Sequence, residues 1–210
     1  MIWSDIVVKK SFVKLSALRV AKGMILIMNN YYAGIGSRKI PQDIADIMEE
    51  LGFCLSRKGF ILRSGASPGS DTAFELGTIR AEGKFDIYLP WKGFGKREGD
   101  GYHNAENLPN YRKAKSLAVK YHPKFKRLSE ESKKLIIRDT YQILGYDLGT
   151  PCRFVICWTE DACVSDALRT EKTGGTGQAI SIASDLMIPI YNIRIESHKE
   201  KVVNWIKSCY

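Results

Sequence analysis

Three glycine-rich turns stand where a predicted strand gives way to a predicted helix. They are GIGSR at residues 34–38, RSGASPGSD at residues 63–71 and TGGTGQ at residues 173–178. In a parallel sheet such turns gather at the carboxyl ends of the strands, where helix N-termini direct backbone N–H groups toward an anion. The three turns together therefore predict a pocket for a phosphate or a ribose phosphate.

The second turn carries the most chemical detail. It lacks the Gly-Lys-Ser/Thr ending of a nucleoside-triphosphate hydrolysis loop, so we do not expect that chemistry. Ser70 or Asp71 is predicted to cap the following helix, and Asp71 shares one helical face with Glu75. Two interpretations of these acids stay open: a structural cap with a helix-face carboxylate, or a carboxylate that accepts a hydrogen bond from a ribose hydroxyl. Arg63 faces either the pocket or the neighbouring strand.

Residues of all three turns are expected around the ligand, because the turns should meet at one edge of the sheet. In chain order they are Gly34, Gly36, Ser37, Arg38, Arg63, Ser64, Gly65, Gly69, Asp71, Gly174, Gly175, Thr176, Gly177 and Gln178.

Strands and helices alternate along residues 31–210, which we interpret as a single domain. This order predicts an α/β fold, a three-layer Rossmann-like sandwich in which helices cover both faces of a parallel sheet. The predicted strands are 31–36, 59–65, 85–91, 152–158 and 188–193, and helices are predicted from Pro41 and over 70–83, 129–145, 174–187 and 199–209. Residues 1–30 form an extension that is either an amphipathic helix or upstream sequence translated from an early start codon.

Positive charge is concentrated in a basic segment, residues 92–134, inserted into this rhythm. The chain has a net charge of +9, and the segment holds twelve Lys and Arg against five Asp and Glu, interleaved with aromatic residues. Two interpretations stay open: a surface for single-stranded DNA, or a helix that covers a small nucleotide or faces solvent. The candidate nucleic-acid patch consists of Lys120, Lys124, Lys126 and Arg127.

The remaining composition narrows the class of protein. The five cysteines form no C-x-x-C pair and have no nearby histidine partner, so we expect neither a metal site nor a disulfide framework. No apolar run approaches the roughly 18 residues that span a bilayer. We therefore expect a cytoplasmic protein that needs no cofactor and does not contact a membrane. We also expect it to form a homo-oligomer.

Two stretches, YAGIGSRKIPQDIADIMEELG and ILRSGASPGSDTAFELG, resemble the SLOG superfamily of Rossmann-like nucleotide-binding proteins. The first two turns are similar to the motifs of its DprA branch. The third turn resembles the GGxGTxxE motif of Lonely-Guy phosphoribohydrolases, and Arg138 resembles an arginine on the helix before that family's fourth strand. The similarity covers about residues 31–193 and adds Arg138 to the expected ligand-binding residues.

This chain departs from both branches. Ser181 stands where Lonely-Guy enzymes have their glutamate and Gln178 where they have threonine, and residues 158–173 are an insertion. A serine cannot stabilise a developing ribosyl cation. No C-terminal winged-helix domain of the DprA type is recognisable.

The resemblance therefore implies a protein that binds a nucleotide-derived ligand, as a sensor or a sequestering protein. Small stand-alone chains of this type occur in phage genomes, where sequestration of a signalling nucleotide would counter a host defence. Two alternatives stay open. One is a DprA-like mediator that binds single-stranded DNA, and the other is a nucleoside-monophosphate phosphoribohydrolase that uses Arg138, Glu160 and Asp161.

Overall fold

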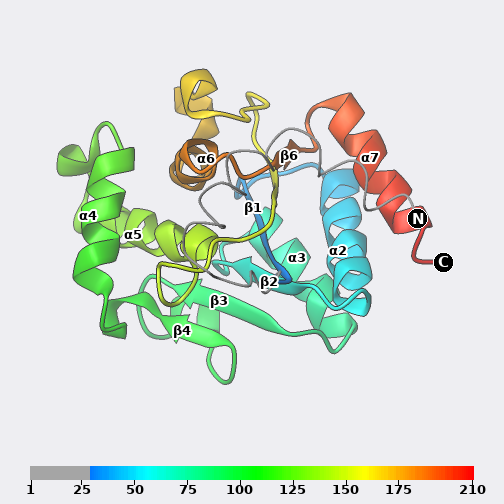
Figure 1. Ribbon diagram of the computed structural model, residues 1–210, viewed down its shortest axis with the longest axis horizontal. Helices are drawn as coiled ribbons and strands as arrows, with labels where there is room; N and C mark the ends of the chain where they lie inside the picture. Colours follow the sequence, from blue (N-terminus) through cyan, green and yellow to red (C-terminus); the bar gives the residue numbers. More distant parts are fainter. Residues whose placement is uncertain (1–28) are drawn as a thin grey trace, which may run out of the picture.

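Six short strands form one parallel sheet in the computed structural model, which describes residues 29–210 (Figure 1). The sheet order is β4-β3-β2-β1-β5-β6. The strands are β1 (Tyr31–Gly36), β2 (Ile61–Ser64), β3 (Phe85–Leu89), β4 (Tyr102–Asn104), β5 (Val155–Trp158) and β6 (Ile190–Asn192). The predicted α/β class with a parallel sheet is confirmed. Residues 1–28, and with them the two interpretations of the N-terminal extension, lie outside the described residues.

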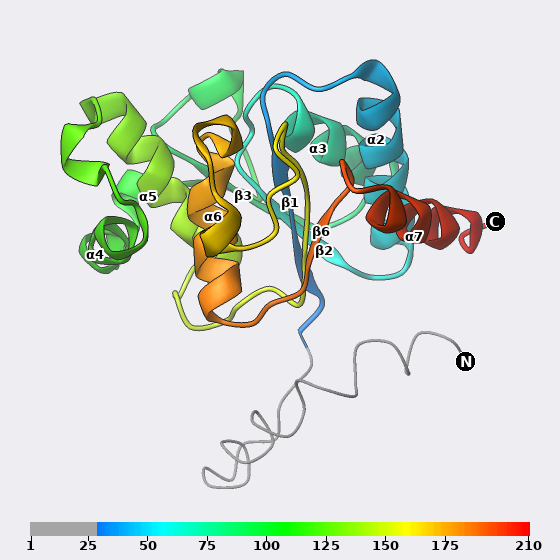
Figure 2. The same cartoon turned by 90° about the horizontal axis from the view of Figure 1, so that it is seen from above.

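Residues 29–210 contain six α-helices, five of which pack on the two faces of the sheet. They are α2 (Gln42–Arg57), α3 (Ser70–Arg80), α4 (Tyr111–Tyr121), α5 (Glu130–Leu144), α6 (Thr176–Asp185) and α7 (Glu196–Lys207). Figure 2 shows α2, α3 and α7 on one side of the strands and α5 and α6 on the other, with α4 outside them. The predicted three-layer sandwich is thus present.

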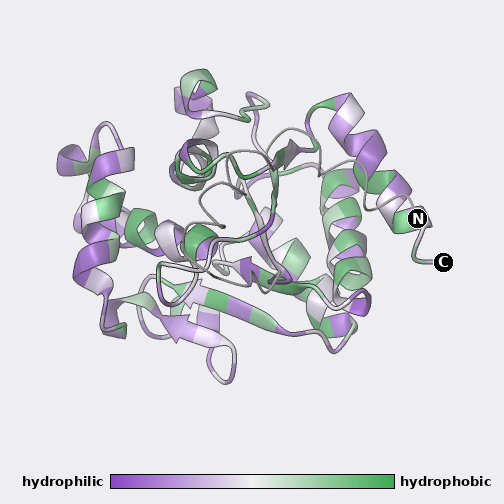
Figure 3. Cartoon of the chain, viewed as in Figure 1, coloured by the Kyte–Doolittle hydropathy of each residue, from purple (hydrophilic) through white to green (hydrophobic). Residues whose placement is uncertain are grey.

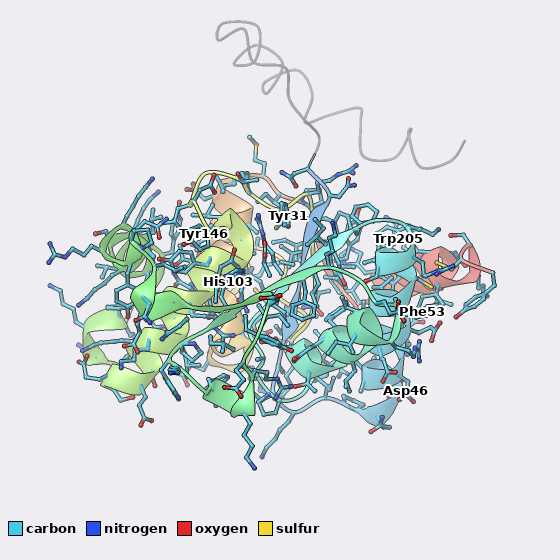
Figure 4. The ribbon with its side chains drawn as sticks, turned by 90° about the horizontal axis from the view of Figure 1, so that it is seen from below. Tyr31, Asp46, Phe53, His103, Tyr146 and Trp205 are labelled. Carbon is cyan, nitrogen blue, oxygen red and sulfur yellow. The ribbon has the colours of Figure 1, made fainter. Side chains whose placement is uncertain are left out.

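Successive side chains along a strand enter two different apolar cores, as expected for a sheet that is covered on both faces. In β1, Tyr32 packs toward α2 and α3, whereas Ala33 and Ile35 pack toward α5 and α6. The indole of Trp205 on α7 packs against the core that contains Tyr32 (Figure 4). On the other face, the rings of His103 and Tyr146 lie 5.6 Å apart between β4 and the end of α5 (Figure 4).

The strand order reverses at β1. The chain builds β2, β3 and β4 on one side of β1 and then crosses over to place β5 and β6 on the other side. The loops after β1 and β5 therefore leave the sheet in opposite directions, which opens a crevice at their carboxyl ends. This crevice positions the site described below.

The basic segment is the part of the fold that the pattern predicted least well. It contains β4, the short α4 and three single 3₁₀ turns, and β4 was not predicted because its sequence, YHN, has no strand-like alternation. The 3₁₀ turns are Phe94–Lys96, Ala105–Asn107 and Phe125–Arg127. Only Ala114 and Ala118 of α4 are buried, and much of its surface is hydrophilic (Figure 3).

The predicted cap of α3 is wrong. The N-cap position is Gly69, whose φ of 79° suits a residue without a side chain, and no side chain caps the helix. Instead, the carboxylate of Asp71 accepts a hydrogen bond from the backbone N–H of Ser67, in the turn before the helix. None of the helices in residues 29–210 is long and apolar enough to cross a membrane.

Candidate functional site

A cavity of about 870 Å³ lies at the carboxyl ends of the strands, where the strand order reverses. Its volume is within the range of small-molecule sites. Residues from all three predicted turns line it, together with residues of α5 and of the segment that follows α4. The sequence-predicted residues that line it are Gly36, Ser37, Arg38, Asp71, Arg138, Gly174, Gly175 and Thr176.

The first two turns are bound to each other. Both the N–H and the hydroxyl of Ser70 donate to the backbone oxygen of Ser37, at 3.2 and 3.1 Å. Gly69 permits this approach, because a Cβ there would lie 2.5 Å from the carbonyl oxygen of Arg38. Gly69 therefore shapes the turns without lining the cavity.

The side chain of Arg138 enters the cavity from α5 and is almost completely buried, with 3% exposure. Its guanidinium lies 3.6 Å from Asp71 and 3.1 Å from Asp139, and it donates to the hydroxyl of Ser67 at 3.2 Å. Gly65 supports this position, because a Cβ there would lie 1.1 Å from Nη1 of Arg138. Gly65 is thus needed for packing against the arginine, and it does not line the cavity.

The two carboxylates beside Arg138 have raised pKa values, because burial outweighs the nearby cations, which act in the opposite direction. Desolvation by burial raises the pKa of Asp71 to about 6, although Arg138 and the N–H groups of Ser67 and Gly36 act in the opposite direction. Desolvation likewise raises the pKa of Asp139 to about 7, opposed by the charges of Arg138 and Arg38 and reinforced by that of Asp71. Both carboxylates are therefore easier to protonate than ordinary aspartates.

The third turn is held from outside the cavity by Asp161. This carboxylate accepts hydrogen bonds from the hydroxyls of Thr170, at 2.6 Å, and Thr173. Desolvation acts to raise the pKa of Asp161, but bonds from these threonines, from Thr159 and from the N–H of Cys163 outweigh it and lower the pKa to about 2. Asp161 is therefore ionised at neutral pH and fixes the loop that carries Thr170 and Thr173 into the cavity wall.

The N-terminus of α6 opens into the cavity through Gly174, Gly175 and Thr176. No side chain caps this helix. The N–H groups of Gly175 and Thr176 have no hydrogen-bond partner among the described residues. Such free N–H groups at a helix N-terminus suit an anion, since they also carry the positive end of the helix dipole.

A second arginine, Arg169, lines the cavity from the inserted segment. It donates to the backbone oxygen of Tyr121 at 3.0 Å and to the hydroxyl of Ser181 at 2.7 Å. Its guanidinium also packs on Gly177, where a Cβ would lie 2.5 Å from Nε. Ser181 is buried and bonded to Asp166 as well, so its hydroxyl serves an internal contact between α6 and residues 158–173.

Two further cations reach the cavity. Arg38 is exposed and has no ion-pair partner among the described residues, whereas Lys124 pairs at 3.2 Å with Glu171, whose side chain is 93% exposed. His122 is half-buried beside them. Desolvation and then the charge of Arg169 lower the pKa of His122, so this ring favours its neutral form.

Several predicted residues lie elsewhere. Gly34 is packed within β1 against Phe74, and the hydroxyl of Ser64 donates to the backbone oxygen of Gly34 at 2.7 Å. The guanidinium of Arg63 stacks on the ring of Tyr31, 3.7 Å from its centroid, and donates to Thr150. Of its two open interpretations, the structure favours the sheet over the pocket.

Gln178 and Glu160 also lie outside the cavity. The amide of Gln178 is buried and directed at the backbone of Ala118 on α4, at 3.5 Å. Glu160 pairs with Lys172 at 2.9 Å in an exposed contact. The hydrolase alternative would therefore need a different carboxylate from Glu160 or Asp161.

The candidate nucleic-acid patch is divided. Lys124 lines both the main cavity and a smaller neighbouring hollow of about 520 Å³, whereas Lys126 and Arg127 line only the hollow. Lys120 instead pairs with Asp185 at 3.3 Å on α6. Within residues 29–210, no cluster of His, Cys, Asp and Glu could hold a metal ion.

Sequence reasoning missed Asp139, Gln142 and Arg169. With its amide nitrogen facing Asp139, Gln142 donates to Oδ1 at 3.2 Å and accepts from the N–H of Gly65 at 3.0 Å. The local sequence gave little signal, because Arg138, Asp139, Thr140 and Gln142 make residues 136–144 nearly half polar, and only the structure shows that all nine are buried. Buried polar groups placed together in this way form an internal polar network.

Comparison with protein-family models, with curated proteins and with solved structures finds no match.

Proposed function

We propose that this protein binds a nucleotide-derived ligand in the cavity at the carboxyl ends of β1 and β5, and that it acts as a sensor or a sequestering protein. The observation that carries the proposal is the meeting of free N–H groups of α6 with the unpaired cation of Arg38 in one cavity. A phosphate or ribose phosphate is the ligand class that satisfies both, since each oxygen accepts several hydrogen bonds.

Turnover is not required by this arrangement. Ser181, at the position of the Lonely-Guy glutamate, is bonded to Arg169 and Asp166, and neither Glu160 nor Asp161 lines the cavity. The carboxylates that line this cavity are Asp71 and Asp139, both engaged with Arg138, and Glu171, which pairs with Lys124. The proposal therefore favours binding, and chromatography of a long incubation with adenosine monophosphate should recover the nucleotide unchanged.

The binding experiment compares a cation that lines the cavity, Arg38, with two cations beside it, Lys126 and Arg127. Calorimetric titration with adenosine monophosphate and ribose 5-phosphate should show binding to the wild type, and Arg38→Ala should weaken it about fivefold, because an exposed charge-assisted contact is lost. The matched control is Lys126→Ala with Arg127→Ala, which removes two charges beside the main cavity. Unchanged affinity in Arg38→Ala, or no binding to the wild type, would contradict the proposal.

The same control variant tests the DNA-binding alternative. Lys126 and Arg127 have no ion-pair partner among the described residues, so they are free to contact a phosphate backbone. If single-stranded DNA is the partner, the control variant should lose affinity for a labelled oligonucleotide and show a shallower salt dependence. Unchanged oligonucleotide binding would remove this alternative.

A further inference from the structure

The cavity wall contains two chemically different groups of residues. One group, which we call the anion end, consists of Arg38, Arg169 and the N-terminus of α6. The other group, which we call the acid floor, consists of Asp71, Arg138, Asp139 and Gln142, all nine-tenths or more buried. With both acids ionised, the acid floor carries one more negative charge than positive charge, so it repels a bare anion.

Asp139 has an oxygen without a partner. Its Oδ1 contacts Arg138 and Gln142, but its Oδ2 has no hydrogen-bond partner among the described residues. The residue is only 7% exposed, and it lines the cavity. Oδ2 is therefore open to the cavity and is not enclosed by protein. A ligand that displaces solvent there has to supply a hydrogen-bond donor, because an ionised carboxylate oxygen left without one is costly.

We propose that Asp139, positioned by Arg138 and assisted by Asp71, is the specificity-determining residue for the sugar part of the ligand. Its Oδ2 accepts a hydrogen bond from a sugar hydroxyl, while the phosphate of the same ligand lies at Arg38 and the N-terminus of α6. The proposal rests on the proposed function and adds the orientation of the ligand in the cavity. The cavity selects sugar phosphates over anions that lack a donor, such as sulfate.

The charges around Asp139 explain why it discriminates between these ligands. Arg138 and Asp71 touch the cluster from α5 and α3, and Arg38 faces it from the turn after β1. His122, Lys124, Arg169 and Glu171 lie along the rest of the cavity wall. Neutralising Asp139 leaves the cations less compensated, which favours a bare anion, but it also weakens the acceptor that a sugar hydroxyl needs.

The test is a pair of titrations on the wild type and on Asp139→Asn at pH 8. The substitution keeps the shape of the side chain and removes its charge. The affinity for ribose 5-phosphate should fall about tenfold, because a hydrogen bond to a charged acceptor becomes one to a neutral acceptor. The affinity for sulfate should rise about threefold, because the repulsion is gone. Asp185→Asn, at the far end of α6, removes the same charge outside the cavity and should change neither affinity.

A second measurement uses pH instead of a substitution. Sulfate keeps its charge between pH 6.5 and 8.5, so any change in its affinity belongs to the protein. The wild type should bind sulfate more tightly at pH 6.5, where the acid floor takes up a proton, and Asp139→Asn should show a smaller change. Any contribution of His122 appears in both proteins and cancels in the comparison.

The outcomes separate the two proposals. If the wild type binds neither ligand, the proposed function fails. If both ligands bind but Asp139→Asn shifts their affinities in the same direction, or in neither, the assignment of Asp139 is overturned while the proposed function stands. Should Asp139→Asn fail to fold, Asp71→Asn and the pH dependence of sulfate binding in the wild type decide the matter, since both should favour sulfate over ribose 5-phosphate.

Discussion

Two of the three arginines that line the cavity, Arg138 and Arg169, pack in the same way but in different electrostatic settings. Arg138 lies on Gly65 and Arg169 lies on Gly177, so each guanidinium occupies the space of a missing side chain. Arg138 is compensated by two buried carboxylates, whereas Arg169 faces Asp166, whose side chain is 66% exposed, at 3.6 Å. The same residue type is therefore fixed by charge at one end of the cavity and mainly by hydrogen bonds at the other.

The difference teaches what each end can offer a ligand. A buried, doubly compensated arginine cannot move toward a phosphate without leaving Asp71 and Asp139 unpaired, which is unfavourable. An arginine bonded mainly to neutral oxygens, with one exposed carboxylate at 3.6 Å, keeps more of its charge available to an anion in the cavity. The Arg138 end thus supplies rigidity and hydrogen-bond acceptors, and the Arg169 end supplies positive charge.

The largest expected difference between the two arginines is in the free energy of unfolding that is lost when each is replaced. Arg138→Met leaves two buried carboxylates side by side, and we expect it to lower the free energy of unfolding by about 3–5 kcal/mol. Arg169→Met removes hydrogen bonds to Tyr121 and Ser181 at a less buried site, and should cost about 1–2 kcal/mol. Urea unfolding at pH 8 measures both.

The loss in Arg138→Met should be smaller at pH 6, because the carboxylates can then protonate. Equal losses for the two arginine variants, or a loss independent of pH for Arg138→Met, would show that the carboxylates do not depend on Arg138.

Substituting Gly65 and Gly177, on which the two guanidiniums pack, tests the same comparison with smaller expected losses of stability. Gly65→Ala pushes on a guanidinium that Asp71 and Asp139 hold in place, so we expect a loss of about 2–4 kcal/mol. Gly177→Ala displaces a guanidinium with 14% exposure and gains up to about 1 kcal/mol of helix propensity within α6. Its net effect should be close to zero. Thermal unfolding of both variants gives the answer, and similar melting temperatures would contradict the difference in rigidity.

The fold could be predicted from the sequence more completely than the site. Strands such as VICW are buried along their whole length, and the periodic helices between them leave a parallel sheet as the natural arrangement. The turns were predicted at the correct edge for the same reason. β4 was missed because its three residues show no strand pattern of their own. They form a strand only by pairing with β3, from which an irregular connection separates them in sequence.

The acid floor was harder to predict because its partners are distant in sequence. Asp71 and Arg138 are 67 positions apart and belong to helices on opposite faces of the sheet, and only folding brings their side chains together at its carboxyl edge. Gly65 and Gly177 looked like phosphate-binding glycines, yet both serve an arginine side chain. A glycine turn alone does not distinguish a ligand from a guanidinium, since both need the same empty space beside the backbone.

The smallest expected effect concerns pH, and it should have opposite signs at the two ends. At the Arg138 end, the pKa of Asp139 is raised to about 7 from an ordinary 3.8, so the folded chain binds a proton that the unfolded chain releases between these values. The stability from this group is present at low pH and is lost as the pH rises toward 7. At the Arg169 end, the pKa of His122 is lowered by desolvation and by Arg169, so its contribution is lost as the pH falls below the ordinary value of 6.5.

Two variants should separate these signs when unfolding by urea is measured at pH 5, 6.5 and 8. Relative to the wild type, Asp139→Asn should gain stability between pH 5 and pH 8, by about 2 kcal/mol, since one proton per molecule corresponds to about 1.4 kcal/mol per pH unit. His122→Gln should change in the opposite sense and by less, because the histidine is only half-buried. Other titrating groups are common to all three proteins and cancel in the differences. Parallel pH profiles for the wild type and Asp139→Asn would mean that Asp139 has the same proton affinity in the folded and unfolded chains, and the acid floor would lose its distinction from the Arg169 end.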